Sequence, residues 1–190
     1  MKHLTVKEKD ALSFEKLKGT FGYKNVNAAP HLKKVVLNVG TGTAIKKDKN
    51  KNTFISERLM KITGQKPSMR GAKQSVASFK IRQGDPVGVM VTLRGARMYT
   101  FLEKLINLSL PRTKDFRGIS RTVVDDIGNM TLGIKEHTIF PETADEDIKD
   151  VFGLAITVVS SAKSKKEGYA FYELIGVPFK SEEDSKKKKK

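Results

Sequence analysis

Alternating apolar and polar residues predict the strands of this chain. The alternation is clearest in two segments, Lys33–Val39 and Val87–Arg94. In each, every second residue is aliphatic and is expected to face a core: Val35, Leu37 and Val39 in the first, and Val89, Val91 and Leu93 in the second. The intervening residues point away from that core: Lys34, Val36 and Asn38 in the first, and Met90, Thr92 and Arg94 in the second. Two further strands are predicted, over Met130–Lys135 and Leu154–Ser160.

Apolar residues spaced three to four positions apart predict the helices. The predicted helices are Val6–Gly19, Thr53–Thr63, Ala96–Leu108 and a C-terminal helix that runs to Ile175. Glycines are expected to end three of them, at Gly19, Gly64 and Gly176. Ser164 and Glu167 have the spacing of a capping box, which predicts where the last helix begins.

The segment Ser68–Arg82 shows neither periodicity and is predicted to be a long exposed loop or a hairpin arm. If this segment is counted as a strand, the order of elements is α-β-α-β-β-α-β-β-α. This order predicts an α+β fold, in which an antiparallel-rich sheet has helices packed on one face. The other face is then open, either as an ordinary solvated face or as a platform for RNA.

The net charge of the chain limits the classes of partner that it is expected to bind. Lys and Arg number 37 against 21 Asp and Glu, which gives a net charge of +16 in 190 residues. Such a balance favours nucleic acid first and an acidic membrane second. The chain has no Cys, which excludes disulfides and thiolate chemistry and suits the cytoplasm. No stretch approaches the roughly 20 apolar residues of a membrane span, so we expect no membrane partner.

The charge is also unevenly distributed. From His31 to Thr100, 15 basic residues face three acidic ones, whereas from Arg121 to Ser160 three basic residues face eight acidic ones. The chain should therefore have a basic pole, which is the candidate RNA face, and an acidic pole. The acidic pole contains Glu142, Asp145, Glu146, Asp147 and Asp150. It is either a solvated surface or a contact for a basic protein.

Catalytic chemistry has no candidate in the sequence. The run Gly40–Thr43 follows a strand, but the third glycine of a dinucleotide loop is missing, so a strand-ending turn is expected. The three histidines, His3, His31 and His137, share no metal-ligand spacing and are interpreted as isolated surface or capping residues. We predict a protein that is not an enzyme and has no cofactor and no metal.

Two segments stand out for their side-chain chemistry, and one of them suits RNA. The first joins Gln65–Pro67 to Lys73–Gly84 and combines cations with amides, hydroxyls and Phe79; its alternative is a plain basic loop. The second, Pro111–Gly118, is interpreted as a helix-stopping turn with an internal Asp–Arg pair.

Over about residues 10–180, the sequence resembles the large-subunit ribosomal protein five family, in its bacterial type. The matching stretches are Val35–Gly42, Thr63–Pro67, Ser75–Gly84, Val91–Gly95, Asp115–Gly118, Ile139–Glu142 and Val177–Phe179. Lys-Ile-Arg-Gln-Gly within Ser75–Gly84 and Asp-Phe-Arg-Gly at Asp115–Gly118 are the most specific of them.

The resemblance implies a scaffold in the central protuberance of the large ribosomal subunit. Its partners would be 5S rRNA, 23S-type rRNA, neighbouring large-subunit proteins, peptidyl-site tRNA and a protein of the small-subunit head. Positions matched to rRNA binding are Asn38, Gln65 and Thr92, with Lys66 and Arg94 supplying charge. The arm that would contact tRNA carries Lys73, Gln74, Ser75, Lys80 and Arg82. The acidic pole would face the small subunit.

The chain departs from the family at two places. Lys46–Lys51 is richer in lysine than expected, and Ser181–Lys190 forms a charged tail beyond the family's usual end. We therefore expect one RNA-binding domain over residues 1–180, followed by that tail. The alternative function is a free-standing RNA-binding regulator or RNA chaperone, and an enzyme acting on RNA is the third choice.

Overall fold

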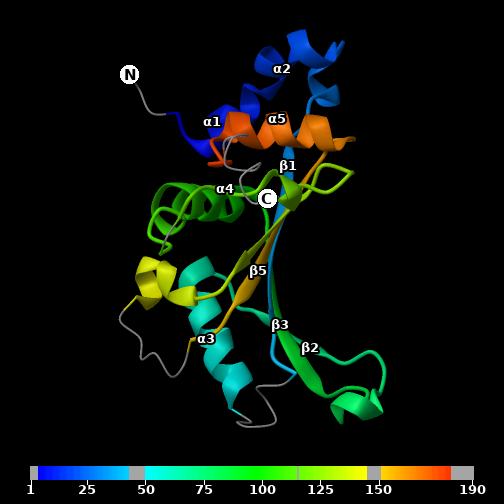
Figure 1. The fold of residues 1–190 in the computed structure, drawn as a ribbon, viewed down its shortest axis with the longest axis vertical. Coiled ribbons are helices and arrows are strands. Elements are labelled where there is room, and N and C mark those ends of the chain that lie inside the picture. Colours follow the sequence, from blue (N-terminus) through cyan, green and yellow to red (C-terminus); the bar gives the residue numbers. More distant parts are fainter. Residues whose placement is uncertain (1–3, 43–49, 115, 145–150, 181–190) are drawn as a thin grey trace, which may run out of the picture. The chain divides into compact units, whose positions relative to one another are not determined.

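The fold contains five strands and five α-helices in the residues that the structure, a computed structural model, describes: 4–42, 50–114, 116–144 and 151–180. The strands are β1 (Leu32–Gly40), β2 (Ser68–Gly71), β3 (Pro86–Leu93), β4 (Met130–Ile134) and β5 (Leu154–Ser160). They form one sheet in the order β2-β3-β1-β5-β4 (Figure 1). The helices are α1 (Val6–Ala11), α2 (Ser13–Phe21), α3 (Lys51–Thr63), α4 (Gly95–Lys104) and α5 (Lys165–Ile175). The α+β prediction is confirmed.

The contacts divide the chain into two compact units. The first unit comprises Met1–Val35, Arg94–Leu132 and Thr157–Lys190, and the second comprises Val36–Leu93 and Gly133–Ile156. Strands β1, β4 and β5 contribute residues to both units. No helix in the described part of the chain is long and apolar enough to cross a bilayer.

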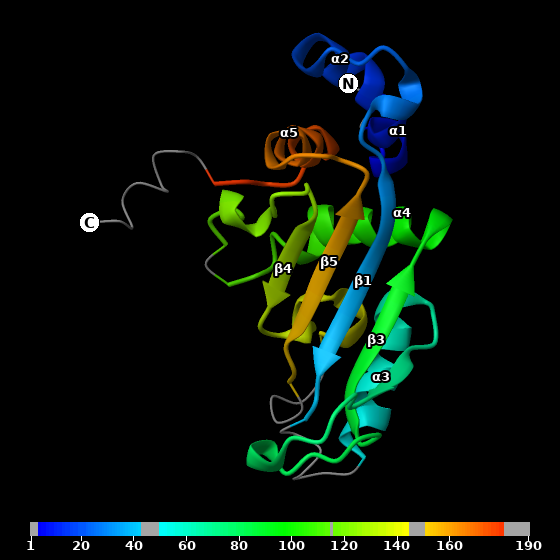
Figure 2. The ribbon, with the colours of Figure 1, turned by 90° about the vertical axis from the view of Figure 1, so that its right-hand side faces the viewer.

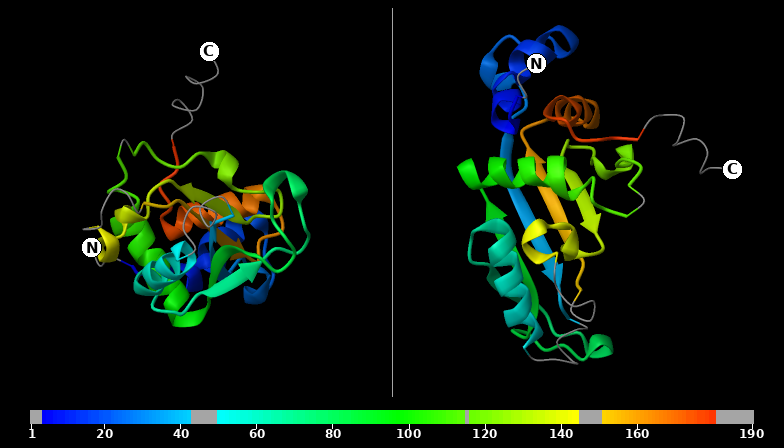
Figure 3. Two further views of the ribbon diagram at one scale, coloured as in Figure 1. Left: turned by 90° about the horizontal axis from the view of Figure 1, so that it is seen from below. Right: turned by 90° about the vertical axis from the view of Figure 1, so that its left-hand side faces the viewer.

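The second unit has helix α3 on one face of its strands. Figure 2 shows α3 behind β3, and Figure 3 shows it from the helix side. The helix buries Ile55, Leu59 and Ile62 at the predicted spacing. The strands bury their predicted aliphatic residues: Leu37, Val39, Val89, Val91 and Leu93. Gly64 ends the helix with φ 67°, a backbone conformation that costs glycine little.

The first unit contains a tightly packed interior around α5. The Tyr172 hydroxyl donates to the carbonyl oxygens of Gly128 and Val158 at 3.1 and 3.0 Å. A Cβ added to Gly168 would lie 2.6 Å from the Gly128 Cα atom, so the backbone of the turn touches the helix there. The Ser160 hydroxyl also donates to the Gly128 carbonyl, at 2.8 Å. The turn at Gly128, helix α5 and strand β5 therefore meet in close contact.

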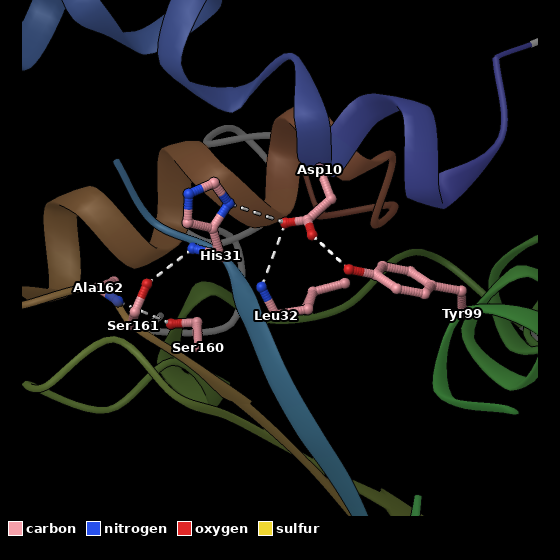
Figure 4. Close-up of polar contacts among 7 residues, drawn as sticks. All are labelled: Asp10, His31, Leu32, Tyr99, Ser160, Ser161 and Ala162. Carbon is pink, nitrogen blue, oxygen red and sulfur yellow. Dashed lines mark hydrogen bonds and ion pairs between the residues drawn. The ribbon is translucent and has the colours of Figure 1, made fainter. Parts of the chain in front are cut away.

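A buried carboxylate holds helix α1 to the start of β1. Asp10, which is only 5% exposed, accepts hydrogen bonds from the Leu32 N–H at 3.2 Å and the Tyr99 hydroxyl at 2.7 Å (Figure 4). His31 Nδ1 lies 3.9 Å from the same carboxylate. Burial of the ring and the bond to Asp10 raise the pKa of Tyr99 to about 12. A buried charge is tolerated here because several donors surround it.

The N-terminal helix of the first unit differs from the sequence prediction in two details. The predicted helix 6–19 is two helices that meet at Leu12. Because buried residues keep their helical spacing across this bend, periodicity cannot reveal it. Gly19 lies inside α2, and Gly22, at φ 67°, ends it. A glycine inside a helix costs only about 1 kcal/mol, so it is a weak stop signal.

The capping box predicted at the start of α5 is only half formed. Ser164 Oγ accepts from the Glu167 N–H, but the Glu167 carboxylate accepts from the Lys163 N–H and the Tyr23 hydroxyl and makes no reciprocal bond.

The sequence predicts that His137 is a surface or capping residue, yet it is fully buried. Its ring stacks on Phe152 with centroids 4.0 Å apart, and its Nδ1 accepts from the Phe152 N–H at 3.3 Å. The surface interpretation is therefore wrong, whereas the contact with a backbone N–H agrees with the capping alternative.

A candidate nucleic-acid interface

The face of the second unit opposite α3 presents the polar side chains of Asn38 and Thr92 among apolar ones. In β1 and β3, the residues between the buried aliphatic ones are exposed or half-buried, as the alternation predicted. They include Asn38, Met90 and Thr92. We call these three residues, with the β2 residues Ser68 and Arg70 described below, the open face; Figure 2 views its strands with α3 behind them.

Strand β2 extends the open face. It pairs antiparallel with β3, with Ser68 opposite Met90 and Arg70 opposite Gly88. Residues directly opposite each other share a face of the sheet, so Ser68 and Arg70 lie on the open face. All four residues of β2 are exposed. The sequence reasoning missed both side chains because it interpreted the segment from Ser68 onward as a loop or arm.

The position of Asn38 follows from a contact at the end of β1. The Thr41 N–H donates to the Val87 carbonyl at 2.8 Å. Counting three residues back along β1 and three forward along β3 leads to Asn38 and Met90, so these two residues lie opposite each other in the sheet. Asn38 is exposed, and among the described residues no hydrogen bond holds its amide. Both its donor and its acceptor are therefore available to a ligand.

Gln65 and Thr92, which the sequence places 27 residues apart, are joined directly. Gln65 Nε2 donates to the Thr92 carbonyl at 3.1 Å, and the Gln65 N–H donates to Thr63 Oγ1 at 3.3 Å. These contacts fix the amide beside the open face. The neighbouring Lys66 is exposed and adds a positive charge.

Arg94 does not belong to this unit. It lies in the first unit as the residue that precedes α4, and it is exposed. Its charge is available to a polyanion there.

Residues 71–84 form a closed arm. At its base, the Ala72 N–H donates to the Asp85 carbonyl at 2.8 Å and the Gly84 N–H donates to the Ala72 carbonyl at 3.0 Å. Near its tip, Val76 and Ile81 form an antiparallel bridge. A Cβ on Gly71 would lie 3.0 Å from the Gly84 carbonyl oxygen, so glycine at position 71 lets two backbones approach closely. The hairpin alternative is thus the backbone arrangement that the structure has.

The predicted arm residues are exposed on this hairpin: Lys73, Gln74, Ser75, Lys80 and Arg82. Ser75 Oγ also has an internal role, because it accepts from the Gln83 N–H at 3.0 Å. Lys80 has φ 50°, unusual for a residue with a side chain, and follows Phe79, which is 63% exposed. The tip therefore presents an exposed aromatic ring next to the cation of Lys80, which suits RNA.

The remaining predicted sites are only partly visible. Glu142 is exposed in a short 3-10 turn, Pro141–Thr143, whereas Asp145, Glu146, Asp147 and Asp150 lie outside the described residues. The Asp–Arg pair predicted in Pro111–Gly118 involves Asp115, which also lies outside them, as do Lys46–Lys49 and the tail. Within the described ranges, no three His, Asp or Glu side chains gather as a metal site.

Two family profiles match the sequence, one after the other. Residues 25–82 match the profile described as Ribosomal protein L5, and residues 86–179 match the profile of the C-terminus of the same ribosomal family. Together they include the open face and residues 71–82 of the arm.

Curated bacterial proteins are similar over most of the chain. "Large ribosomal subunit protein uL5" of Desulfosudis oleivorans is 50% identical over 166 residues, which cover 87% of this chain and 92% of the relative. The uL5 proteins of Halothermothrix orenii and Synechocystis sp. are each 48% identical, over 86% and 87% of this chain and 91% and 92% of their own lengths.

Proposed function

The chain belongs to the ribosomal protein L5 family, and we propose that it binds 5S rRNA in the central protuberance through the open face. As a family member it is a non-enzymatic protein of the large ribosomal subunit, at work on the cytoplasmic ribosome. Membership in a ribosomal family disfavours the alternative, a free-standing RNA-binding regulator or chaperone. It also implies rRNA and neighbouring ribosomal proteins as partners, and 23S-type rRNA is the second RNA that we propose.

The observation that carries the proposal is an open sheet face with two polar side chains that have no hydrogen-bond partner among the described residues. Asn38 presents an amide and Thr92 a hydroxyl, and no described residue bonds either side chain. Neutral donors and acceptors can recognise ribose hydroxyls and base edges, while Lys66 supplies charge for phosphates. Gln65, held against the Thr92 carbonyl, completes the set. Residues 1–180 would act as one RNA-binding domain in this role.

Binding of 5S rRNA by a double variant tests the proposal. Asn38→Ala with Thr92→Ala should weaken binding at least about tenfold, because two groups that hydrogen-bond RNA are removed. Lys61→Ala is the control, since Lys61 is exposed on α3, which packs on the other face of the strands. Unchanged binding by the double variant would rule out the open face. In a separate measurement on the unmodified protein, a failure to co-sediment with large subunits in high salt would instead favour the free-standing regulator.

We propose that the arm contacts peptidyl-site tRNA. Its cations Lys73, Lys80 and Arg82 are exposed, and the first acidic residue that follows them in the sequence, Asp85, accepts from the Arg82 backbone N–H. Phosphates of tRNA would neutralise these cations. The arm would be mobile in the free protein and ordered by tRNA, because few apolar residues pin it.

We propose that the acidic pole faces a basic protein of the small-subunit head. Glu142 is exposed, and carboxylates repel phosphate while attracting a cationic protein surface. Neutralising Glu142, Asp145, Glu146, Asp147 and Asp150 together should weaken subunit association at low salt. Unchanged association would leave a solvated acidic surface as their role.

A further inference from the structure

We propose that Arg70 is an RNA-binding residue of the open face, where its guanidinium clamps a phosphate of the bound RNA. The inference rests on the proposed function of that face and adds to it a residue that neither the sequence pattern nor the family match identified. It begins from the pairing of β2 with β3.

The register of β2 orients Arg70. Ser68 lies opposite Met90 and Arg70 opposite Gly88, so Arg70 shares a face with Met90 and Thr92. The register shifts between Arg70 and Gly71, where Gly71 lies opposite Pro86. Such a bulge ends regular pairing and redirects the side chains beside it. Arg70 is therefore the last residue of β2 in regular register, immediately before the arm.

The surroundings of Arg70 leave its charge available. The side chain is exposed, and among the described residues no hydrogen bond or ion pair holds its guanidinium. Gly88, directly opposite, has no side chain that could shield it. A Cβ at Gly88 would lie 3.1 Å from the Val39 carbonyl oxygen, so close strand packing disfavours a larger residue. Gly88 itself is buried in the sheet, so the exposed group at this position is the Arg70 side chain.

The chemistry of arginine selects the ligand. A planar guanidinium donates two parallel hydrogen bonds to a phosphate, which fixes the phosphate's orientation as well as attracting its charge. An unpaired arginine on an edge strand also resists pairing with a second sheet edge; this general role requires only the charge. A lysine would preserve the charge and lose the two-pronged geometry, so the two roles can be separated by experiment.

Two variants and one control test the inference with 5S rRNA as the probe. Arg70→Ala should weaken binding about tenfold and reduce the slope of log K against log salt by about 0.7–0.9, the value for one phosphate. Arg70→Lys should keep the slope while still weakening binding, because the charge remains and the bidentate contact is lost. Lys61→Ala, which removes one exposed charge from α3, should change neither quantity beyond about twofold.

The outcomes separate this inference from the proposal on which it rests. If Asn38→Ala with Thr92→Ala weakens binding and Arg70→Ala does not, the open face stands and the role of Arg70 is wrong. If neither weakens binding, the open face itself is wrong. If Arg70→Ala weakens tRNA retention and leaves 5S rRNA binding intact, Arg70 belongs to the arm and the inference fails. Thermal unfolding of each variant must match the parent protein, since a four-residue edge strand contributes little to stability.

Discussion

The interior of the first unit and the open face of the second unit use polar side chains in opposite ways. In the first, Asp10 and Tyr172 are buried, and each makes two hydrogen bonds to other parts of the unit. On the second, Asn38 and Arg70 are exposed and no described residue bonds them. The first arrangement stabilises a fold, whereas the second leaves hydrogen-bonding capacity for a ligand. Substitutions should therefore separate stability from RNA binding.

The largest expected effect is on stability, from a single methyl group in the first interior. Gly168→Ala would place its Cβ 2.6 Å from the Gly128 Cα and 2.9 Å from its carbonyl oxygen. Because backbone atoms must move, we expect about 3 kcal/mol of lost stability in urea unfolding. Gly19→Ala is the matched control: this helical glycine has no atom within 4 Å of an added Cβ. It should stabilise the protein by about 0.5–1 kcal/mol. Equal effects would contradict the packing described for α5.

A second contrast compares one polar residue from each region. Asp10→Ala leaves the Leu32 N–H and the Tyr99 hydroxyl without their acceptor, at a cost of about 2 kcal/mol. Asn38→Ala removes an exposed amide with no internal bond and should change stability by less than about 0.5 kcal/mol. Chemical denaturation of both variants measures the difference. If Asn38→Ala proved as destabilising as Asp10→Ala, the open face would be structural.

The arm gives a third effect, on RNA and not on stability. Replacing Lys73, Lys80 and Arg82 with alanine should weaken peptidyl-site tRNA retention about tenfold and spare 5S rRNA binding, because three phosphate contacts are lost from one site only. Ribosomes carrying the triple variant supply the first measurement, and the isolated protein supplies the second. Equal loss of both would show that the arm and the open face are one site.

Mobility of the arm can be measured on the free protein. Amide hydrogen exchange should be fast over Lys73–Ser78 before tRNA is added, except at Val76, whose N–H donates to the Ile81 carbonyl at 2.9 Å. Strong protection across the whole segment would mean that the hairpin is rigid without tRNA.

The smallest effect is a loss of stability at high pH that originates in the first unit. The pKa of Tyr99 is raised from 10.0 to about 12 by burial of the ring and its bond to Asp10. Because folding favours the neutral tyrosine, this stabilisation is complete below pH 10 and is lost as the pH rises to about 12. Tyr99→Phe should cost about 1 kcal/mol near neutrality and flatten the decline. An unchanged alkaline profile would contradict the Asp10 contact.

Much of the open face could be predicted from the sequence because its strands alternate strictly. Period-two patterning in β1 and β3 placed Asn38 and Thr92 opposite the aliphatic core residues, and the structure confirms that placement. The position of Arg70 on this face could not be predicted, because a four-residue strand is too short to show a period and its register depends on β3. The contact between Gly128 and Gly168 could not be predicted either, because local sequence patterns carry no information about residues 40 positions apart.

Site-specific photo-crosslinking tests the central claim, that the open face binds 5S rRNA, most directly. A photoreactive residue in place of Asn38, on the open face, is compared with one in place of Lys61, on α3. Both are exposed, so both variants should fold and differ only in the face that carries the probe. We predict a crosslink to 5S rRNA from position 38 and none from position 61. A crosslink from position 61 with none from position 38 would contradict the account.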